Sequence, residues 1–116
     1  SKGKDRMVVK NLPIVLPDTA MSEVIVRMTE GRLGLALVQD DGKLAGIITD
    51  GDLRRMLVDG TNLTTTMAGT VMNTLPLTIN ADEKMEIAEE KMLEARVQSL
   101  IVTSAQGCID GVVQIY

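Results

Sequence analysis

Apolar and polar positions follow the same order twice along this sequence, with a period of about 65 residues. In the first copy, a short apolar segment at residues 12–16 is followed by Pro17 and by a stripe with helical spacing. The apolar residues of this stripe are Met21, Val24, Ile25 and Met28. Asp18 or Thr19 is a suitable cap for the helix, and Gly31 is a suitable end.

The rest of the first copy predicts a hairpin and a second helix. Residues 35–38 are a continuous apolar run, and Asp41-Gly42 is a strong two-residue turn before a second run at 44–48. A short helix over residues 53–58 then leads to Asp59-Gly60. The first copy therefore predicts the order strand, helix, strand, strand, helix.

The second copy repeats these elements less completely. Residues 76–79 repeat the entry strand, and Asn80 followed by Glu83 resembles a helix cap. The buried stripe of the next helix is Met85, Ala88 and Met92. Residues 100–102 and 111–113 repeat the two hairpin strands, with Gly107 in the turn. The order predicts an α+β fold of two units that bury their apolar faces against each other.

These patterns place the two repeats at residues 12–60 and 75–116. A connecting segment at residues 61–74 contains a short helical patch at 67–72. Residues 1–11 are polar and basic at their start, and we expect a linker or an artificial lead-in there. Because the sequence ends at Tyr116, we expect the second repeat to lack its final helix.

The composition argues against several classes of function. A net charge of −4, with one Tyr and no Phe or Trp, is unfavourable for a partner made of nucleic acid. No apolar run reaches the roughly 18 residues of a membrane span, and no signal peptide is visible, so we expect no membrane partner and a cytoplasmic location. With no His and a single Cys108, the sequence shows no acid–base pair, and we expect neither a catalytic nor a metal site.

Candidate chemistry concentrates at residues 46–55, where an apolar strand meets the start of a helix. Gly46 permits a close approach of neighbouring backbone, and the Thr49 hydroxyl can donate to a phosphate oxygen. Asp52 can accept hydrogen bonds from the two hydroxyls of a ribose, and free N–H groups at the helix start suit an anion. The other polar members of this cluster are Asp50, Arg54 and Arg55. The cluster predicts a site for a sugar–phosphate unit.

A simpler interpretation of the same residues stays open. Asp50 or Asp52 can act only as a helix cap, and Thr49 can bond only to local backbone. Two adjacent arginines on a short helix are often a solvated face rather than bidentate phosphate contacts.

The double unit resembles a CBS-domain pair, or Bateman module. The ligand signature of that family is Gly, two apolar residues, Thr or Ser, two variable residues and Asp, and residues 46–52 match it in full. The longer string from Thr49 to Arg55, together with Leu33-Gly34 and Met72-Asn73, resembles the CBS region of the arabinose 5-phosphate isomerases. The resemblance implies tandem β-α-β-β-α repeats with pseudo-twofold symmetry.

The resemblance implies a regulatory module and not a working enzyme. It implies a nucleotide or nucleotide sugar as ligand, such as AMP, ATP or CMP-Kdo, and no required cofactor. Thr49 and Asp52 would hold phosphate and ribose, and apolar residues near Val15 would flank the base. In the second copy, Gln114 stands where Thr49 stands in the first. We therefore expect the second site to be weak or to prefer another ligand.

The resemblance also implies partners. A full-length protein would carry an N-terminal sugar-isomerase domain that interconverts ribulose 5-phosphate and arabinose 5-phosphate for Kdo biosynthesis, as in lipopolysaccharide or capsule synthesis. CBS pairs associate through helix faces, which implies a homodimer. Candidate contributors to that interface are Val24, Met28, Met56, Met85 and Met92. The alternative function is a structural dimerisation module that binds no ligand.

Overall fold

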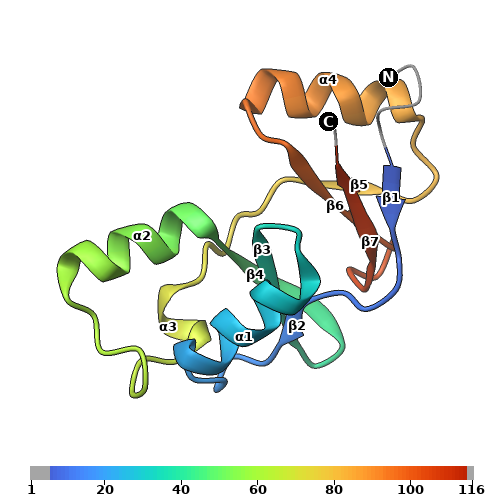
Figure 1. Cartoon of the computed structure of the whole chain (residues 1–116). Coiled ribbons are helices and arrows are strands. Elements are labelled where there is room, and N and C mark those ends of the chain that lie inside the picture. The colour runs from blue at the N-terminus through green and yellow to red at the C-terminus, as the bar shows by residue number, and fades with distance from the viewer. Residues whose placement is uncertain (1–5, 115–116) are drawn as a thin grey trace. The chain divides into compact units, whose positions relative to one another are not determined.

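The computed structural model describes residues 6–114, which divide into two units (Figure 1). The first unit runs from Asn11 to Pro76, and the second combines residues 6–10 with residues 77–114. The fold is α+β, as the sequence predicts, and each unit contains its own sheet. Within residues 6–114, no helix has the length and apolar character needed to cross a bilayer.

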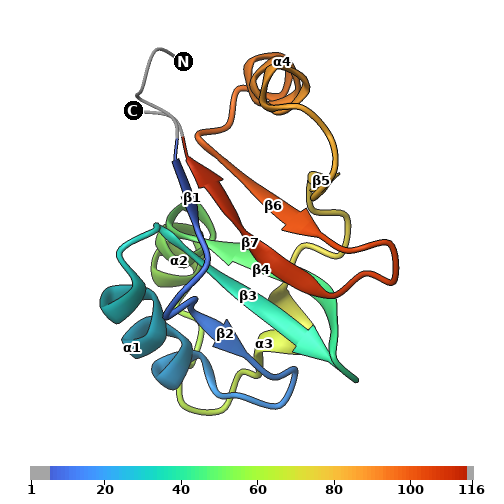
Figure 2. The same ribbon diagram turned by 90° about the vertical axis from the view of Figure 1, so that its right-hand side faces the viewer.

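The sheet of the first unit has three strands in the order β2-β3-β4. They are β2 at Ile14–Val15, β3 at Leu35–Asp40 and β4 at Lys43–Thr49. β2 runs parallel to β3, and β3 and β4 form an antiparallel hairpin (Figure 2). Asp41 and Gly42 in the turn have φ values of 52° and 77°, as a two-residue hairpin turn of this kind requires. The predicted hairpin is confirmed.

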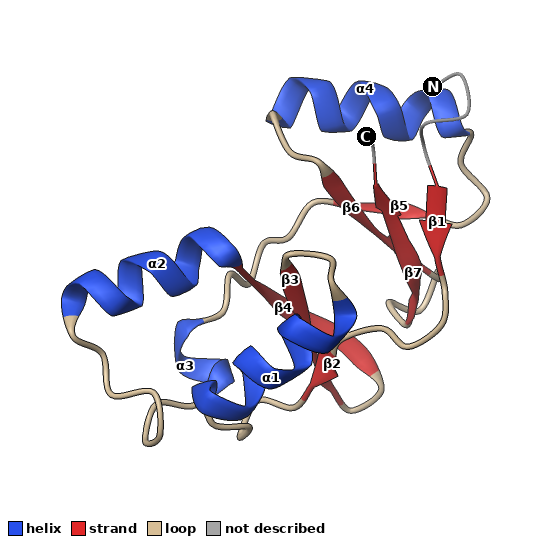
Figure 3. Ribbon diagram, in the orientation of Figure 1, coloured by secondary structure: helices blue, strands red, loops and turns tan. Residues whose placement is uncertain are grey.

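The helices of the first unit pack around this sheet (Figure 3). They are α1 at Met21–Gly31, α2 at Asp50–Asp59 and α3 at Ala68–Val71. The predicted stripe of α1 supplies three buried residues, while Ile25 is only half-buried. The first core, as we name the buried cluster of this unit, consists of Val15, Met21, Val24, Met28, Ala36, Val38, Ile48, Met56 and Ala68.

The sheet of the second unit has four strands in the order β1-β7-β6-β5. They are β1 at Arg6–Val8, β5 at Thr78–Asn80, β6 at Ser99–Thr103 and β7 at Ile109–Gln114. The parallel β5–β6 pair and the antiparallel β6–β7 pair repeat the arrangement of β2, β3 and β4. Helix α4 at Met85–Ala95 contributes Ala88 and Met92 to the core of this unit, whereas Met85 is exposed.

Strand β1 differs from our expectation of a linker at residues 1–11. Arg6–Val8 pair antiparallel with β7, so the linker interpretation is wrong for these residues. Gly111 on β7 allows this close pairing, because a Cβ there would lie 2.7 Å from Met7 Cε and 2.8 Å from the Val8 carbonyl oxygen. Residues 1–5 lie outside the described residues. A three-residue strand is too short for its hydrophobic alternation to predict it.

The segment at residues 61–74 belongs to the first unit and is more than a connection. The Ala68 N–H donates to the Thr19 carbonyl oxygen at 2.8 Å. Asn73 and Ile47 exchange two backbone hydrogen bonds, which lie at 2.8 and 3.0 Å. These bonds tie the segment to β4 and to the entrance of α1.

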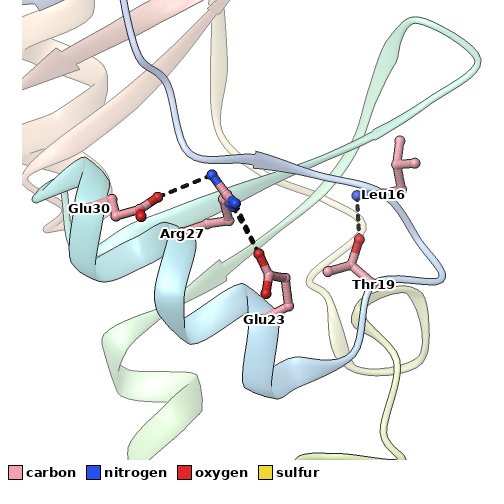
Figure 4. Close-up of polar contacts among 5 residues, drawn as sticks. All are labelled: Leu16, Thr19, Glu23, Arg27 and Glu30. Atoms are coloured by element: carbon pink, nitrogen blue, oxygen red, sulfur yellow. Dashed lines mark hydrogen bonds and ion pairs between the residues drawn. The ribbon is translucent and has the colours of Figure 1, made fainter.

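The predicted caps of the two long helices are wrong. Helix α1 begins after Ala20 and α4 after Lys84, and neither residue makes a side-chain cap. The Thr19 hydroxyl instead accepts a hydrogen bond from the Leu16 N–H at 3.0 Å (Figure 4). Glu83 accepts a hydrogen bond from the Asn80 N–H at 2.9 Å before α4 begins. The local bonding capacity of these residues therefore serves the loops and not the helix starts.

The outer face of α1 is polar and solvated. Arg27 forms ion pairs with Glu23 at 3.0 Å and with Glu30 at 3.1 Å (Figure 4). All three side chains are about half exposed or more. Each ion pair therefore stabilises the fold by only roughly a few tenths of a kcal/mol.

Four of the five residues that we expect at a homodimer interface are buried inside their own units. Val24, Met28 and Met56 are at most 8% exposed in the first unit, and Met92 is 1% exposed in the second. Only Met85, at 42% exposed, is available to another chain. The apolar stripe of each helix packs on the sheet of its own unit. A hydrophobic stripe in the sequence does not show whether the helix packs on its own sheet or on a partner chain.

Candidate functional site

The candidate site lies where β4 ends and α2 begins. Helix α2 starts at Asp50 and not at Leu53 as predicted, because Thr49 and Asp52 form a reciprocal cap. The Thr49 N–H donates to Asp52 Oδ2 at 2.9 Å, and the Asp52 N–H donates to Thr49 Oγ1 at 3.3 Å. The cap that the simpler interpretation of the signature predicts is therefore present.

The second carboxylate oxygen of Asp52 is also engaged. Asp52 Oδ1 accepts a hydrogen bond from Arg55 Nη2 within an ion pair. The side chain of Asp52 is 20% exposed and that of Arg55 is 72% exposed. An ion pair with so exposed a cation contributes at most about 1 kcal/mol. Asp52 is thus fixed by the cap on one oxygen and weakly paired on the other.

Three polar groups converge on Gly51 in the first turn of α2. A Cβ at Gly51 would lie 3.7 Å from Thr49 Oγ1, 3.8 Å from Arg54 Nη2 and 3.8 Å from Arg55 Nη1. Among the described residues, Arg54 has no hydrogen bond or ion pair. A cavity of about 310 Å³ adjoins this point, and its described lining is Gly51, Arg54, Arg55, Val58 and Asp59. The two guanidinium groups give this side of the helix a concentration of donors suited to an anion.

Asp50 faces a different cavity. Its N–H donates to the Gly34 carbonyl oxygen at 3.0 Å, and a Cβ on Gly34 would lie 3.2 Å from Asp50 Oδ2. The cavity measures about 310 Å³ and is lined by Ile25, Met28, Thr29, Arg32, Gly34, Asp50 and Leu53. Arg32 and Gly34 are absent from our predicted site. Both residues have positive φ values, 58° for Arg32 and 73° for Gly34. In the sequence, the only signal of this bend is the pair of glycines at positions 31 and 34.

Two predicted residues serve packing and do not line either cavity. Gly46 is buried, and a Cβ there would lie 2.7 Å from the Asn73 carbonyl oxygen and 2.7 Å from Met72 Sδ. The close approach that we expect at Gly46 is therefore real, but its neighbour is the segment after α3. Val15 is 5% exposed and belongs to the first core, so its side chain is committed to that packing.

Gln114, the counterpart of Thr49 in the second repeat, lies at the end of β7. Its Nε2 donates to Ser99 Oγ at 2.9 Å, which joins the ends of β6 and β7. The next two residues, which we align with Asp50 and Gly51, lie outside the described residues.

The cap makes one stability prediction. Replacing Thr49 with alanine is expected to lower the free energy of unfolding by about 1 kcal/mol, because the Asp52 N–H loses its acceptor. Thr49→Ser retains the hydroxyl and is expected to stay within about 0.5 kcal/mol of wild type. Urea denaturation followed by circular dichroism measures both. An alanine variant as stable as the serine variant would show that the cap contributes nothing.

Comparison with known sequences identifies relatives. Residues 5–59 match the CBS domain family. The arabinose 5-phosphate isomerase KpsF of Escherichia coli is 42% identical over 107 residues, which are 91% of this chain and 33% of that protein. A probable arabinose 5-phosphate isomerase of Haemophilus influenzae is 39% identical over 114 residues, which are 97% of this chain and 34% of that protein. The chain spans about a third of the length of these relatives.

Comparison with solved structures gives the same fold. A CBS domain protein of Pyrobaculum aerophilum, complexed with AMP, has a TM-score of 0.80 at 20% identity, with 94% of this chain and 81% of that chain covered. CBSX2 in complex with AMP has a TM-score of 0.78 at 26% identity, with 93% and 85% covered.

Residues 5–59 thus match the CBS domain family, and the fold is similar to that of solved CBS-domain structures. More particularly, most of the chain is similar in sequence to the arabinose 5-phosphate isomerases KpsF and KdsD.

Proposed function

We propose that this chain is the ligand-sensing regulatory part of an arabinose 5-phosphate isomerase. In this proposal, the first unit binds a nucleotide or a nucleotide sugar, such as an adenine nucleotide or CMP-Kdo, at the start of α2. The observation that carries it is the convergence of the Thr49 hydroxyl and two guanidinium groups on Gly51, next to the Asp52 carboxylate.

Each group has a distinct role in this proposal. The guanidinium groups of Arg54 and Arg55 bind phosphate oxygens, since a planar fork of donors matches that geometry. The Thr49 hydroxyl donates to the same phosphate, and Asp52 accepts from a ribose hydroxyl. AMP in the related CBS structures supports a nucleotide as the ligand class.

The proposed regulation extends beyond this chain. The relatives are isomerases roughly three times as long as the matched region. This length supports a sugar-isomerase domain elsewhere in the full protein. That domain would interconvert ribulose 5-phosphate and arabinose 5-phosphate on the route to Kdo. A ligand alters such a domain only if it binds two arrangements of the protein with different affinities.

Isothermal titration calorimetry with AMP, ATP, CMP and CMP-Kdo tests the proposal. At least one of them is expected to bind, and Asp52→Asn is expected to weaken it about tenfold, because the acceptor loses its charge while its shape is kept. Asp18→Ala removes a carboxylate from an exposed loop position and is the matched control. No binding of any of the four at millimolar concentration, or an unchanged affinity in Asp52→Asn, would contradict ligand sensing at this site.

A structural dimerisation module is the second candidate function. It is favoured by exposed apolar side chains on two helices, namely Leu57 at 65%, Val58 at 86% and Leu93 at 74%. Such side chains are suited to contact with a second copy of the chain. A chain that sediments as a dimer but binds none of the four nucleotides would support this candidate over the first.

A further inference from the structure

We infer that Gly34 is a positioning residue for the proposed ligand site and that it acts through Asp50, the first residue of α2. Gly34 lies directly before β3, outside residues 46–55 where the candidate chemistry concentrates. The inference rests on the proposed function and deepens it, because it makes ligand binding depend on a residue that itself touches no ligand.

Gly34 contacts both the backbone and the side chain of Asp50. Its carbonyl oxygen accepts the Asp50 N–H at 3.0 Å. An N–H group at the start of a helix has no partner within the helix, so this bond fixes where α2 begins relative to the sheet. A Cβ on Gly34 would lie 3.2 Å from Asp50 Oδ2, which is closer than ordinary van der Waals contact. Any side chain at residue 34 therefore requires the carboxylate to move.

The backbone of Gly34 adds a second constraint. Its φ value is 73°, in the left-handed region where a residue with a Cβ is strained. Relief of that strain would redirect the Gly34 carbonyl, and relief of the close contact would displace the Asp50 carboxylate. Both changes act on Asp50.

The second unit shows that the fold itself does not require this conformation. Helices α1 and α4 end at left-handed caps, Arg32 and Arg96, each with a φ of 58°. Two residues further on, Gly34 is left-handed again, whereas its counterpart Gln98 is not. The strands give the same alignment, since β3 and β6 begin at the residues directly after these two. The first unit alone also carries Thr49 of the signature, so the left-handed turn accompanies the candidate site and is not a general property of the repeat.

A shift of Asp50 would change the direction of the site and not its internal bonds. Asp50 is the neighbour of Thr49 and lies two residues before Asp52. The reciprocal bonds between Thr49 and Asp52, at 2.9 and 3.3 Å, hold these two residues together as a cap. The cap would therefore move as one body when the start of α2 moves. We expect a weaker ligand site on a helix that still forms.

Titration calorimetry with AMP on wild type, Gly34→Ala and Gly42→Ala tests this inference. Gly42 is the matched control, because its φ is 77° in the hairpin turn of the same unit and an added Cβ meets nothing within 4 Å. Both alanine variants are expected to lower the urea midpoint by similar amounts, since both carry the strain of a left-handed backbone. Gly34→Ala is expected to bind AMP about tenfold weaker, and Gly42→Ala to bind it within about twofold of wild type.

A double-mutant cycle shows whether Gly34 acts through Asp50. Asp50→Ala removes the carboxylate that an added Cβ at residue 34 would approach. With Asp50→Ala as the reference, the loss of AMP affinity caused by Gly34→Ala is expected to shrink to about threefold or less. Circular dichroism at the temperature of the titration verifies that each variant is folded.

The outcomes separate this inference from the function on which it rests. If Gly34→Ala binds AMP as tightly as wild type, the positioning role is wrong and the nucleotide site stands. Equal losses in Gly34→Ala and Gly42→Ala would assign the effect to the stability of the unit, and equal losses with and without the Asp50 carboxylate would show that Gly34 does not act through it. Either result overturns the inference. If wild type binds no AMP, the adenine-nucleotide site and its positioning are overturned together.

Discussion

Replacing Gly46 with alanine is expected to lower the free energy of unfolding of the first unit by about 2 to 3 kcal/mol. The added Cβ would lie 2.7 Å from the Asn73 carbonyl oxygen, where real Cβ atoms are not found. That oxygen accepts the Ile47 N–H at 3.0 Å, so it cannot retreat without breaking a bond that ties the segment after α3 to β4. Met72 Sδ, also 2.7 Å away, is the more easily displaced neighbour.

Gly51→Ala is the control for this prediction, because a Cβ there meets nothing closer than 3.7 Å. It lies in the first turn of α2, where alanine is a better helix former, and is expected to be neutral or stabilising by up to about 0.5–1 kcal/mol. Urea denaturation followed by far-ultraviolet circular dichroism suits both, since the chain has no Trp. A Gly46→Ala variant within about 0.5 kcal/mol of wild type would show that the backbone shifts freely at this point.

Replacing Ile48 with alanine is expected to lower the free energy of unfolding by about 2 to 5 kcal/mol. Ile48 is fully buried in the first core, on the strand that leads directly into the candidate site. The substitution removes three buried carbon atoms and leaves a cavity that the surrounding side chains fill only in part.

Ile87 on α4 provides a control of the same residue type. Its side chain is 38% exposed, so Ile87→Ala is expected to cost about 1 kcal/mol or less. The same denaturation experiment measures the two variants side by side. Equal losses at the two positions would contradict the assignment of Ile48 to a tightly packed core.

The signature at residues 46–52 shows how far a motif can be interpreted without coordinates. Its Thr and Asp are three residues apart, and this spacing suits both a ligand site and a helix cap. Both uses require two side-chain oxygens at that separation, one on a hydroxyl and one on a carboxylate. The structure shows the cap, with Thr49 and Asp52 bonded to each other's backbone. The ligand roles of these residues stay predictions, because the cap leaves the Thr49 hydroxyl able to donate and the Asp52 oxygens able to accept further hydrogen bonds.

The repeat, the hairpins and the helix stripes follow from the sequence because each rests on local chemistry. Asp41-Gly42 has the residues that a tight turn requires, and the stripe of α1 has the period of a helix. Helix α2 begins earlier than its pattern predicts because the reciprocal cap outweighs the low helix propensity of Asp50 and Gly51.

Turn chemistry and hydrophobic period act over a few residues, so the residue pattern is sufficient to predict the order of elements from β2 onward, the α+β class and the set of polar residues at the end of β4. Tertiary structure alone decided that Arg6–Val8 join β7, that residues 61–74 pack on the first unit, and that the methionine stripes face their own sheets. These outcomes depend on contacts between residues distant in sequence, and a pattern of residue types does not specify which of several apolar or polar surfaces will meet.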